Sequence, residues 1–548
     1  MIKKAFWVFI LFVLEIVQAQ VKQPNILWIV CEDSSPTFSM YGDATAKTPN
    51  LNSFAEESLI FENAFATVGV CAPSRSSIIT GMQATSIGTM HMRTGFDIQS
   101  WGKRVYKKEI PITDIKGNSI IQYSAVVPEE VKCFPEYLRA NGYFCTNNQK
   151  TDYQFAAPVT AWDENNNKAH WRNRPDGKPF FSVFNIDLTH ESKLWKHDKL
   201  PLTVDYTKVP VPPYLPDTEV SRKTIARNYS NIELMDAKVG ELLSQLKKDG
   251  LYDSTIVFFY SDHGGPFPRQ KREILDSGLK VPFLIKTINS DTIGRTDRMI
   301  SFVDLAPTIL SLANIKAPKH MDGEAFMGPF EKEKREFVFG SSDRFDEFTD
   351  RIRSVRDKQF LYLKNYYPKL KKYKDVGYRK QVPMMLEILE LQKDNNLNNL
   401  QRIWFDSKTD EELYDCIADP FNLKNLANDP SYTKTLKKMR KALNNTKRKD
   451  FAAIPESKMI QEMWPHFEQP VTAIVNAKQK KNYVKLSCDT KGASIAYFVS
   501  NKKNLTLNFN SGWQLYSKPL QLKKGTYLYT MAERIGYKTS EIEIIEIQ

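Results

Sequence analysis

The segment Asn25-Ile26-Leu27-Trp28-Ile29-Val30-Cys31 is followed directly by Glu32 and Asp33. The run is apolar without alternation, which is typical of a strand buried on both faces of a parallel sheet. Its carboxyl end carries two acids, and open α/β sheets bind their ligands at that end of their strands. The segment therefore predicts a central parallel strand that delivers carboxylates to a functional site.

Two further apolar runs end in polar side chains in the same way. Residues 255–260 lead into Ser261-Asp262-His263-Gly264, and residues 179–186 lead into Asp187 and His190. Residues 229–248 carry apolar side chains at the spacing of an amphipathic helix. We therefore expect an α/β fold with a large, mostly parallel sheet sandwiched by helices.

The pattern changes after about residue 340. A strand-like run at 360–363 and a helix-like run at 384–391 predict a smaller C-terminal α+β subdomain. Short alternating runs then predict a terminal antiparallel β-sandwich, which serves either as a packing module or to position a glycan. These runs are residues 472–475, 483–486, 493–499, 513–516 and 526–531. The expected divisions are a signal peptide (1–19), a catalytic α/β domain (20–340), an α+β subdomain (341–465) and a β-sandwich (466–548).

The amino terminus has the pattern of a secretory signal. Met1-Ile2-Lys3-Lys4 precedes an apolar run at 5–14, and Val17-Gln18-Ala19 supplies a small residue at the expected cleavage point. An uncleaved anchor is the alternative, but the run is short and Glu15 interrupts it. We expect an exported protein, periplasmic or secreted, with no stable membrane anchor.

The cysteine content limits the disulfide bonds that we expect, and the net charge limits the class of ligand. Six cysteines in 548 residues are too few for a disulfide scaffold, and Cys133 with Cys145 is the one plausible bridge. The net charge of +13 indicates either a generic basic surface or attraction to a polyanion. An exported chain without a nucleic-acid-binding motif is not expected to bind nucleic acid, so a sulfated or carboxylated glycan is the better candidate.

The motif Cys71-Ala72-Pro73-Ser74-Arg75 adds the chemistry. With the acids after the first strand, Ser261-Asp262-His263-Gly264 and Gly278-Leu279-Lys280-Val281-Pro282, it resembles the formylglycine-dependent sulfatase family of the alkaline phosphatase superfamily. Leu413-Tyr414-Asp415 is similar to that family's C-terminal signature. The resemblance covers roughly residues 24–430 and implies a bacterial polysaccharide sulfatase with an alkaline-phosphatase-like fold.

The resemblance also implies the cofactors. A formylglycine-generating or sulfatase-maturating enzyme would convert Cys71 to formylglycine, whose hydrated aldehyde attacks the sulfur of a sulfate ester. One Ca²⁺ ion would lie at this residue, and oxygen-rich ligand sets suit that ion. The family usually has Asp where this chain has Glu32. The implied metal residues are Glu32, Asp33, Cys71, Asp262 and His263.

The remaining catalytic roles also follow from the resemblance. Arg75, Lys150 and Lys280 would hold the sulfate group, and His190 would protonate the leaving oxygen. The family typically has His where this chain has Asp152. His91 is either its substitute or a buried histidine without a catalytic role.

Substrate contacts are less clearly encoded. Basic and aromatic side chains mix in two loops near the expected pocket, a composition that suits anionic sugars but is also ordinary for exposed loops. The candidate substrate-binding residues are His170, Trp171, Arg172, Arg174, Lys193, His197 and Arg344.

Two other functions fit the same residues. A phosphonate monoester or phosphodiester hydrolase of the same superfamily would use the same nucleophile and metal. A glycan-binding protein on a catalytically inactive scaffold would use the terminal sandwich instead. The intact motif at Cys71 favours the sulfatase.

Overall fold

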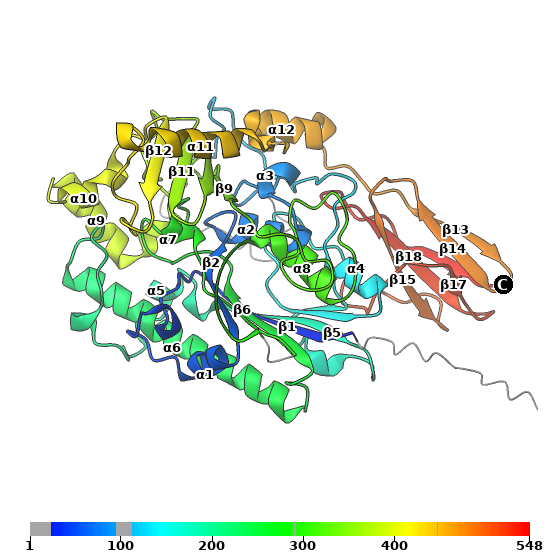
Figure 1. Ribbon diagram of the computed structural model, residues 1–548. Helices are drawn as coiled ribbons and strands as arrows, with labels where there is room; N and C mark the ends of the chain where they lie inside the picture. The colour runs from blue at the N-terminus through cyan, green and yellow to red at the C-terminus, as the bar shows by residue number, and fades with distance from the viewer. Residues whose placement is uncertain (1–22, 95–111, 289–291, 447) are drawn as a thin grey trace, which may run out of the picture.

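The computed structural model describes residues 23–94, 112–288, 292–446 and 448–548 (Figure 1). The expected signal segment, residues 1–19, lies outside them. The large sheet has the strand order β4-β3-β5-β1-β6-β7-β2-β8, and every pair is parallel except the two that β7 makes. Its strands are β1 (Asn25–Cys31), β2 (Leu59–Phe65), β3 (Phe144–Asn148), β4 (Glu164–Asn165), β5 (Phe180–Ile186), β6 (Thr255–Ser261), β7 (Phe283–Lys286) and β8 (Gly294–Ser301).

Strand β1 is buried on both faces, as its apolar run predicts. Leu27 and Ile29 pack into a core that includes residues of α1 (Pro49–Glu56) and α6 (Glu219–Lys248). Trp28, between them, packs into a second core with residues of α2 (Cys71–Thr80) and α8 (Leu305–Leu312). Because successive side chains of a strand point to opposite faces, two layers of helices cover this strand.

Helix α6 begins ten residues earlier than the apolar spacing predicts. Thr218 caps its amino terminus by accepting a hydrogen bond from Ser221 N. The first turns bury polar side chains such as Arg227 and Asn228. These side chains interrupt the apolar pattern, so the sequence prediction starts too late.

The second sheet is antiparallel, with the order β12-β11-β10-β9. Its strands are β9 (Val338–Ser342), β10 (Ile352–Arg356), β11 (Phe360–Asn365) and β12 (Glu411–Asp415). Helix α11 (Thr433–Asn444) buries Met439 against Val355 and Tyr362 of this sheet. The smaller α+β subdomain is thus present. The other α-helices are α3 (Ala84–Ile87), α4 (Pro135–Ala140), α5 (Lys193–Lys196), α7 (Asp276–Leu279), α9 (Pro383–Lys393), α10 (Asn399–Arg402) and α12 (Glu456–Met463).

Two antiparallel sheets form the carboxyl-terminal part and project from one side of the molecule (Figure 1). One has the order β13-β14-β17 and the other β16-β15-β18-β19. Val484, Ile495 and Leu528 belong to the core between them. The bounds are β13 (Val475–Lys480), β14 (Tyr483–Cys488), β15 (Ser494–Ser500), β16 (Gln514–Leu515), β17 (Leu520–Gln521), β18 (Tyr527–Glu533) and β19 (Glu543–Glu546).

The predicted first strand of this sandwich, residues 472–475, is wrong. The strand is β13, which begins at Val475 and is exposed over its other five residues. An exposed polar edge strand has no apolar alternation, so the sequence pattern does not reveal it.

The predicted Cys133–Cys145 disulfide is also wrong, because both residues are free, buried thiols. Each packs in the core beside α4, and burial raises the pKa of both thiols well above the ordinary value. They act as small apolar side chains. In the part of the chain that the structure describes, no helix is both long and apolar enough to cross a membrane.

Candidate catalytic and metal site

Four neighbouring strands of the large sheet, β3, β5, β1 and β6, bring polar side chains together at their carboxyl ends. Lys150 follows β3, and Asp33 and Asp262 follow β1 and β6. His190 follows β5 after the 3-10 turn Asp187–Thr189. Because these strands are parallel, their ends meet at one edge of the sheet, where the site lies.

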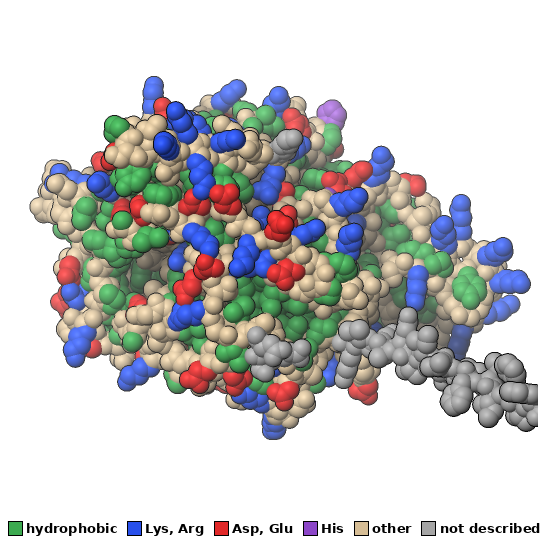
Figure 2. All heavy atoms as spheres, viewed as in Figure 1, with side chains coloured by type: hydrophobic (Ala, Val, Ile, Leu, Met, Phe, Trp, Pro, Cys, Tyr) green, Lys and Arg blue, Asp and Glu red, His purple; other side chains and the backbone are tan. Residues whose placement is uncertain are grey.

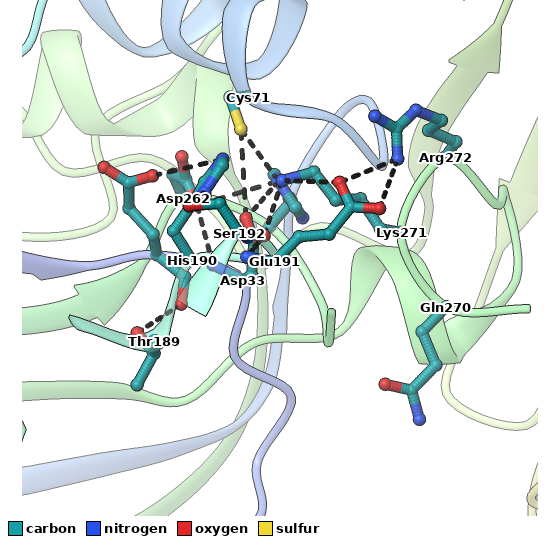
Figure 3. Close-up of polar contacts among 12 residues, drawn as sticks. Asp33, Cys71, Thr189, His190, Glu191, Ser192, Asp262, Gln270, Lys271 and Arg272 are labelled. Carbon is teal, nitrogen blue, oxygen red and sulfur yellow. Dashed lines mark hydrogen bonds and ion pairs between the residues drawn. The ribbon is translucent and has the colours of Figure 1, made fainter. Parts of the chain in front are cut away.

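Helix α2 brings Cys71 into this site (Figure 3). Cys71 is the first residue of the helix and is fully buried. Its Sγ lies 3.3 Å from His263 Nε2 and 3.8 Å from Asp33 Oδ1. Arg75, one turn later, donates from Nε to Asp262 Oδ2 at 3.0 Å and from Nη1 to Asn185 Oδ1 at 2.7 Å. The motif thus places its cysteine and its arginine on the same cluster of acids.

The donor atoms around Cys71 have the character of a cation site. Two overlapping groups bring their donor atoms within 4.8 Å of one another. Both contain Asp33 and Cys71. Among the described residues, Glu32 Oε1 is buried without a hydrogen-bond partner, and Arg75 Nη2 is 3.8 Å away. The groups are Glu32, Asp33, Cys71 and His190, and Asp33, Cys71, Asp262 and His263. Three buried carboxylates with an unsatisfied oxygen fit a hard divalent cation such as Ca²⁺.

Electrostatics in the pocket favour positive charge. Burial alone would lower the pKa of His263, but the carboxylates of Asp262 and Asp33 raise it to about 10. Burial opposes ionisation of Asp33, yet Lys271 and the neighbouring histidines hold its pKa well below the ordinary value. For Glu32, burial dominates and raises the pKa. The pocket thus keeps anionic oxygens beside Cys71 that a cation would neutralise.

Hydrogen bonds define the protonation of the two histidines. His263 Nδ1 donates to the carbonyl oxygen of Gly264 at 3.0 Å, and Nε2 of the protonated ring lies 3.0 Å from Asp33 Oδ1 and 3.3 Å from Cys71 Sγ. Ser192 N donates to His190 Nδ1 at 3.2 Å. Nε2 of neutral His190 therefore carries the hydrogen. Burial and Lys271 hold the pKa of His190 well below the ordinary value, so the ring is a neutral donor.

Lys150 joins the site from the β3 side. Its Nζ lies 2.7 Å from Glu32 Oε2 and 3.9 Å from Asp152 Oδ2. Asp152 is fully buried with a left-handed φ of 54°, and it accepts a hydrogen bond from Arg93 Nη1 at 2.9 Å. Asp152 therefore holds two cations at the edge of the pocket.

A second lysine in the pocket is Lys271 (Figure 3). Its Nζ lies 2.5 Å from Asp33 Oδ2, and its side chain is 2% exposed. Lys280, which the resemblance assigned to the pocket, caps α7 at its carboxyl end. Among the described residues it makes no side-chain hydrogen bond or ion pair. The structure therefore brings Lys271, and not Lys280, to the cluster of acids.

A buried ion network supports Lys271. Glu191 Oε2 lies 3.7 Å from Lys271 Nζ, and Arg272 Nη1 contacts both Glu191 oxygens at 3.0 Å. Arg272 Nε donates to Asp346 at 3.0 Å, which ties the pocket to the segment after β9. Sequence reasoning missed Lys271, Glu191 and Arg272. The signal for Lys271 and Arg272 is a pair of basic residues that begins nine positions after Asp262, and Glu191 directly follows His190.

Two predicted site residues have a structural role instead. Arg344 is fully buried and forms a bidentate ion pair with Glu456 Oε2 and Oε1, at 2.6 and 2.7 Å. His91 accepts a hydrogen bond from Arg344 N, and its Nε2 lies 3.8 Å from Glu456. Burial lowers the pKa of His91 to about 4. Glu456 engages both side chains, so the predicted substrate contact of Arg344 and the catalytic alternative for His91 are wrong.

The loop with His170, Trp171, Arg172 and Arg174 packs along β5. Trp171 is fully buried and stacks on Phe180, the first residue of β5. Both Trp171 Nε1 and Arg172 Nε bond to Asp249, which precedes β6. His170 caps the turn at Trp171, and Arg174 donates to the Trp171 carbonyl. Trp171 also packs on Phe184 near the carboxyl end of β5, and the Ala169 carbonyl accepts a hydrogen bond from Asn148 at the end of β3. The roles of these four residues in substrate binding stay predictions.

Lys193 and His197 lie nearer to the site because they follow His190. Lys193 Nζ pairs with Asp187 at 2.9 Å, and His197 Nδ1 lies 2.8 Å from Asn231 Oδ1 on α6. Their roles in substrate binding stay predictions.

Known proteins match this chain over most of its length. Residues 24–315 match the Sulfatase family model, and residues 267–403 match the model for the C-terminal region of N-sulphoglucosamine sulphohydrolase. An ulvan-active sulfatase from Formosa agariphila is 42% identical over 561 aligned residues, which cover 95% of this chain and 91% of that protein.

Solved structures share the fold. One, in complex with its substrate D-glucosamine-2-N,6-O-disulfate, has a TM-score of 0.52 at 17% identity and covers 80% of this chain and 100% of that chain. A phosphonate monoester hydrolase from Silicibacter pomeroyi has a TM-score of 0.54 at 15% identity and covers 78% of this chain and 96% of that chain. The fold alone therefore does not separate sulfur from phosphorus chemistry. The family match and the 42% identical relative do distinguish the two chemistries, and both indicate sulfur. This chain belongs to the sulfatase family as a sulfuric ester hydrolase.

Proposed function

We propose that this protein is an exported enzyme that removes sulfate ester groups from a sulfated polysaccharide or its oligosaccharides. The observation that carries the proposal is the position of Cys71, fully buried within 3.8 Å of both His263 and Asp33. The similarity to an ulvan-active sulfatase over 95% of the chain supports the polysaccharide substrate. The segment 1–19 supports export.

The proposed metal is Ca²⁺, held by Glu32, Asp33, Asp262 and His263 together with residue 71. When bound, the ion supplies positive charge that acidifies a nucleophilic hydroxyl and neutralises a sulfate oxygen. Lys271 and Arg75 donate to Asp33 and Asp262, and these contacts orient the two carboxylates.

The proposed nucleophile is formylglycine, made from Cys71. The hydrated aldehyde carries two hydroxyl groups, one to attack sulfur and one to expel sulfate afterwards. Because Cys71 is fully buried in the folded chain, a maturating enzyme would have to act before α2 packs onto the sheet.

The side chains of the pocket match the charge that develops on the sulfate group. Arg75 Nη2 is buried and has no hydrogen-bond partner in the described part of the chain, which leaves a donor for a sulfate oxygen. Lys150 and Lys271 add two ammonium groups, one paired with Glu32 and one with Asp33. The Nε2 hydrogen of His190, fixed by the hydrogen bond from Ser192 N, is available to the leaving sugar oxygen.

The experiment compares sulfur with phosphorus esters. Matched aryl sulfate and aryl phosphonate substrates are assayed with the matured enzyme, and products from a panel of sulfated oligosaccharides are resolved by position. We expect the higher kcat/KM on the aryl sulfate and release of sulfate from at least one oligosaccharide. A higher kcat/KM on the phosphonate would contradict the proposal and favour a phosphonate hydrolase.

A further inference from the structure

A large cleft separates the catalytic domain from the carboxyl-terminal sheets. Its volume is about 1520 Å³. One wall contains residues around β3, β4 and the start of β5, and the other contains residues around β15, β16 and β18. Gln149 and Thr151 also line it, and they flank Lys150 of the catalytic pocket. The cleft is thus distinct from the pocket but reaches the loop that carries one of its lysines.

Direct contacts hold the two walls in place. Arg139 donates to the carbonyl oxygens of Thr160 at 2.6 Å and Trp513 at 2.9 Å, one on each side. Val159 N donates to Glu533 Oε2 at 2.6 Å, and Lys132 Nζ donates to the Gly492 carbonyl at 2.6 Å. A cleft with fixed walls loses little entropy when it binds a ligand.

The lining has the chemistry of a sugar site. Aromatic rings from Tyr497, Phe509 and Tyr537 line the sandwich wall, and Phe509 is 66% exposed. An exposed ring offers an apolar face to a sugar ring. Gln149 and Gln514 add exposed amides, which can bond to hydroxyl groups.

The charge of the cleft favours an anion. Lys178, Lys518 and Lys538 line it, all exposed, and within the described ranges none of them has an ion-pair partner. Asp163 pairs with Arg139 at 2.9 Å, and Glu164 accepts hydrogen bonds from the Asn173 side chain and His170 N. Arg139 and the three lysines outnumber Asp163 and Glu164, so the lining carries a net positive charge.

The carboxyl-terminal sheets as a whole also carry a net positive charge. Residues 470–548 contain 12 Lys and Arg against five Asp and Glu, about half of the chain's net charge of +13. Blue side chains gather on these sheets at the right of Figure 2. Such a surface attracts a polyanion over a distance of about 10 Å at moderate ionic strength.

We propose that this cleft is a second binding site, for a stretch of anionic polysaccharide outside the catalytic pocket. Aromatic faces, amides and exposed lysines bind the sugar rings and their sulfate or carboxylate groups. The same chain then extends past Gln149 toward the pocket. The proposal rests on the proposed function only in taking a sulfated polysaccharide as the substrate.

The test measures binding of ulvan, with neutral dextran as reference, to the full-length protein by affinity electrophoresis. The Lys518→Ala/Lys538→Ala variant is expected to raise the Kd for ulvan about fivefold, since each exposed pair contributes about 0.5 kcal/mol. Phe509→Ala is expected to weaken binding further. The matched control, Lys434→Ala/Lys437→Ala, removes the same charge from α11 and leaves the Kd within about twofold.

Steady-state kinetics complete the test. The Lys518→Ala/Lys538→Ala variant is expected to raise KM for ulvan with little change in kcat, at an unaltered melting temperature. An effect equal to that of the α11 control, or ulvan binding no tighter than dextran, would overturn the cleft as a binding site. Hydrolysis of a small aryl sulfate by the wild-type enzyme reports on the pocket alone, so its absence would contradict the proposed function and not the cleft.

Discussion

Lys271 determines the charge balance of the pocket. Its ammonium group lies 2.5 Å from Asp33 and 3.7 Å from Glu191, and both partners are buried. A buried carboxylate that loses its cation is costly. Asp33 would then lose the donor that helps to orient it beside Cys71, and the pocket would lose a positive charge at the proposed position of the sulfate group.

We therefore predict that Lys271→Ala lowers kcat/KM for an aryl sulfate about 100-fold or more, the scale of losing one donor to developing negative charge. Lys280→Ala is the matched control and is expected to retain kcat/KM within about twofold. Melting temperatures of both variants separate lost folding from lost catalysis. An equal loss in both variants would restore the role that the resemblance gives to Lys280.

Arg344 and Glu456 allow a second test. Arg344→Met leaves Glu456 buried without its bidentate partner, which costs about 3–5 kcal/mol of stability. We expect a clear drop in melting temperature, partly recovered in Arg344→Met/Glu456→Leu. A variant that melts like the wild type but has a raised KM would show that Arg344 binds substrate.

These residues show how far sequence reasoning reaches. Asp33, Asp262 and His263 were predictable because each follows a buried apolar strand, and such strand ends converge in parallel sheets. Lys271 lies in an irregular loop between β6 and α7, where spacing does not tell it apart from Lys280. Arg344 looks like an exposed contact in the sequence, since its partner Glu456 is 112 positions away.

At the scale of elements, strand β18 ends where the carboxyl-terminal sheets contact the segment between β3 and β4. Glu533, its last residue, accepts a hydrogen bond from Val159 N, and burial raises its pKa to about 7. In the unfolded chain the carboxyl has an ordinary pKa near 4.5. Between these values the folded state binds more protons, so stability falls as pH rises from about 4.5 to 7.

We predict that Glu533→Gln, which stays neutral and still accepts a hydrogen bond, raises the melting temperature relative to wild type at pH 8 more than at pH 5. Differential scanning fluorimetry at both pH values measures this. Glu541→Gln, an exposed carboxylate of the same sheet region, is the control. The same melting-temperature difference at both pH values would contradict the raised pKa.

Whether a helix or strand could be predicted from the sequence depends on how it is buried. Strands β1, β5 and β6 were predictable because helices cover both of their faces and their sequences are continuously apolar. The exposed β13 and the polar amino-terminal turns of α6 were not, because neither has the apolar pattern that marks an element. The cleft beside the sandwich also escapes prediction, since its lining comes from two segments, 139–178 and 469–539, that lie far apart in the sequence.

For the whole molecule, the proposed ion links activity to stability. Chelation with EGTA is expected to lower sulfatase activity about 100-fold, and added Ca²⁺ is expected to restore it. Ca²⁺ at 100 times its Kd would stabilise the fold by about 2.7 kcal/mol, visible as a higher melting temperature. The Glu32→Gln variant should need a higher Ca²⁺ concentration than the wild type to restore activity and to raise the melting temperature. The control variant Asp249→Asn, at the opposite edge of the sheet, should need the same Ca²⁺ concentration as the wild type. If neither the activity nor the melting temperature changes when EGTA is added, the metal site is contradicted.

The most direct measurement is sulfate released from ulvan, followed by ion chromatography, for the matured wild type, Cys71→Ala and Cys133→Ala. Cys133 is the matched control because it is also a buried free cysteine but lies in the core beside α4. We predict sulfate release by the wild type and by Cys133→Ala, and only background release by Cys71→Ala. Equal release by Cys71→Ala would contradict residue 71 as the nucleophile.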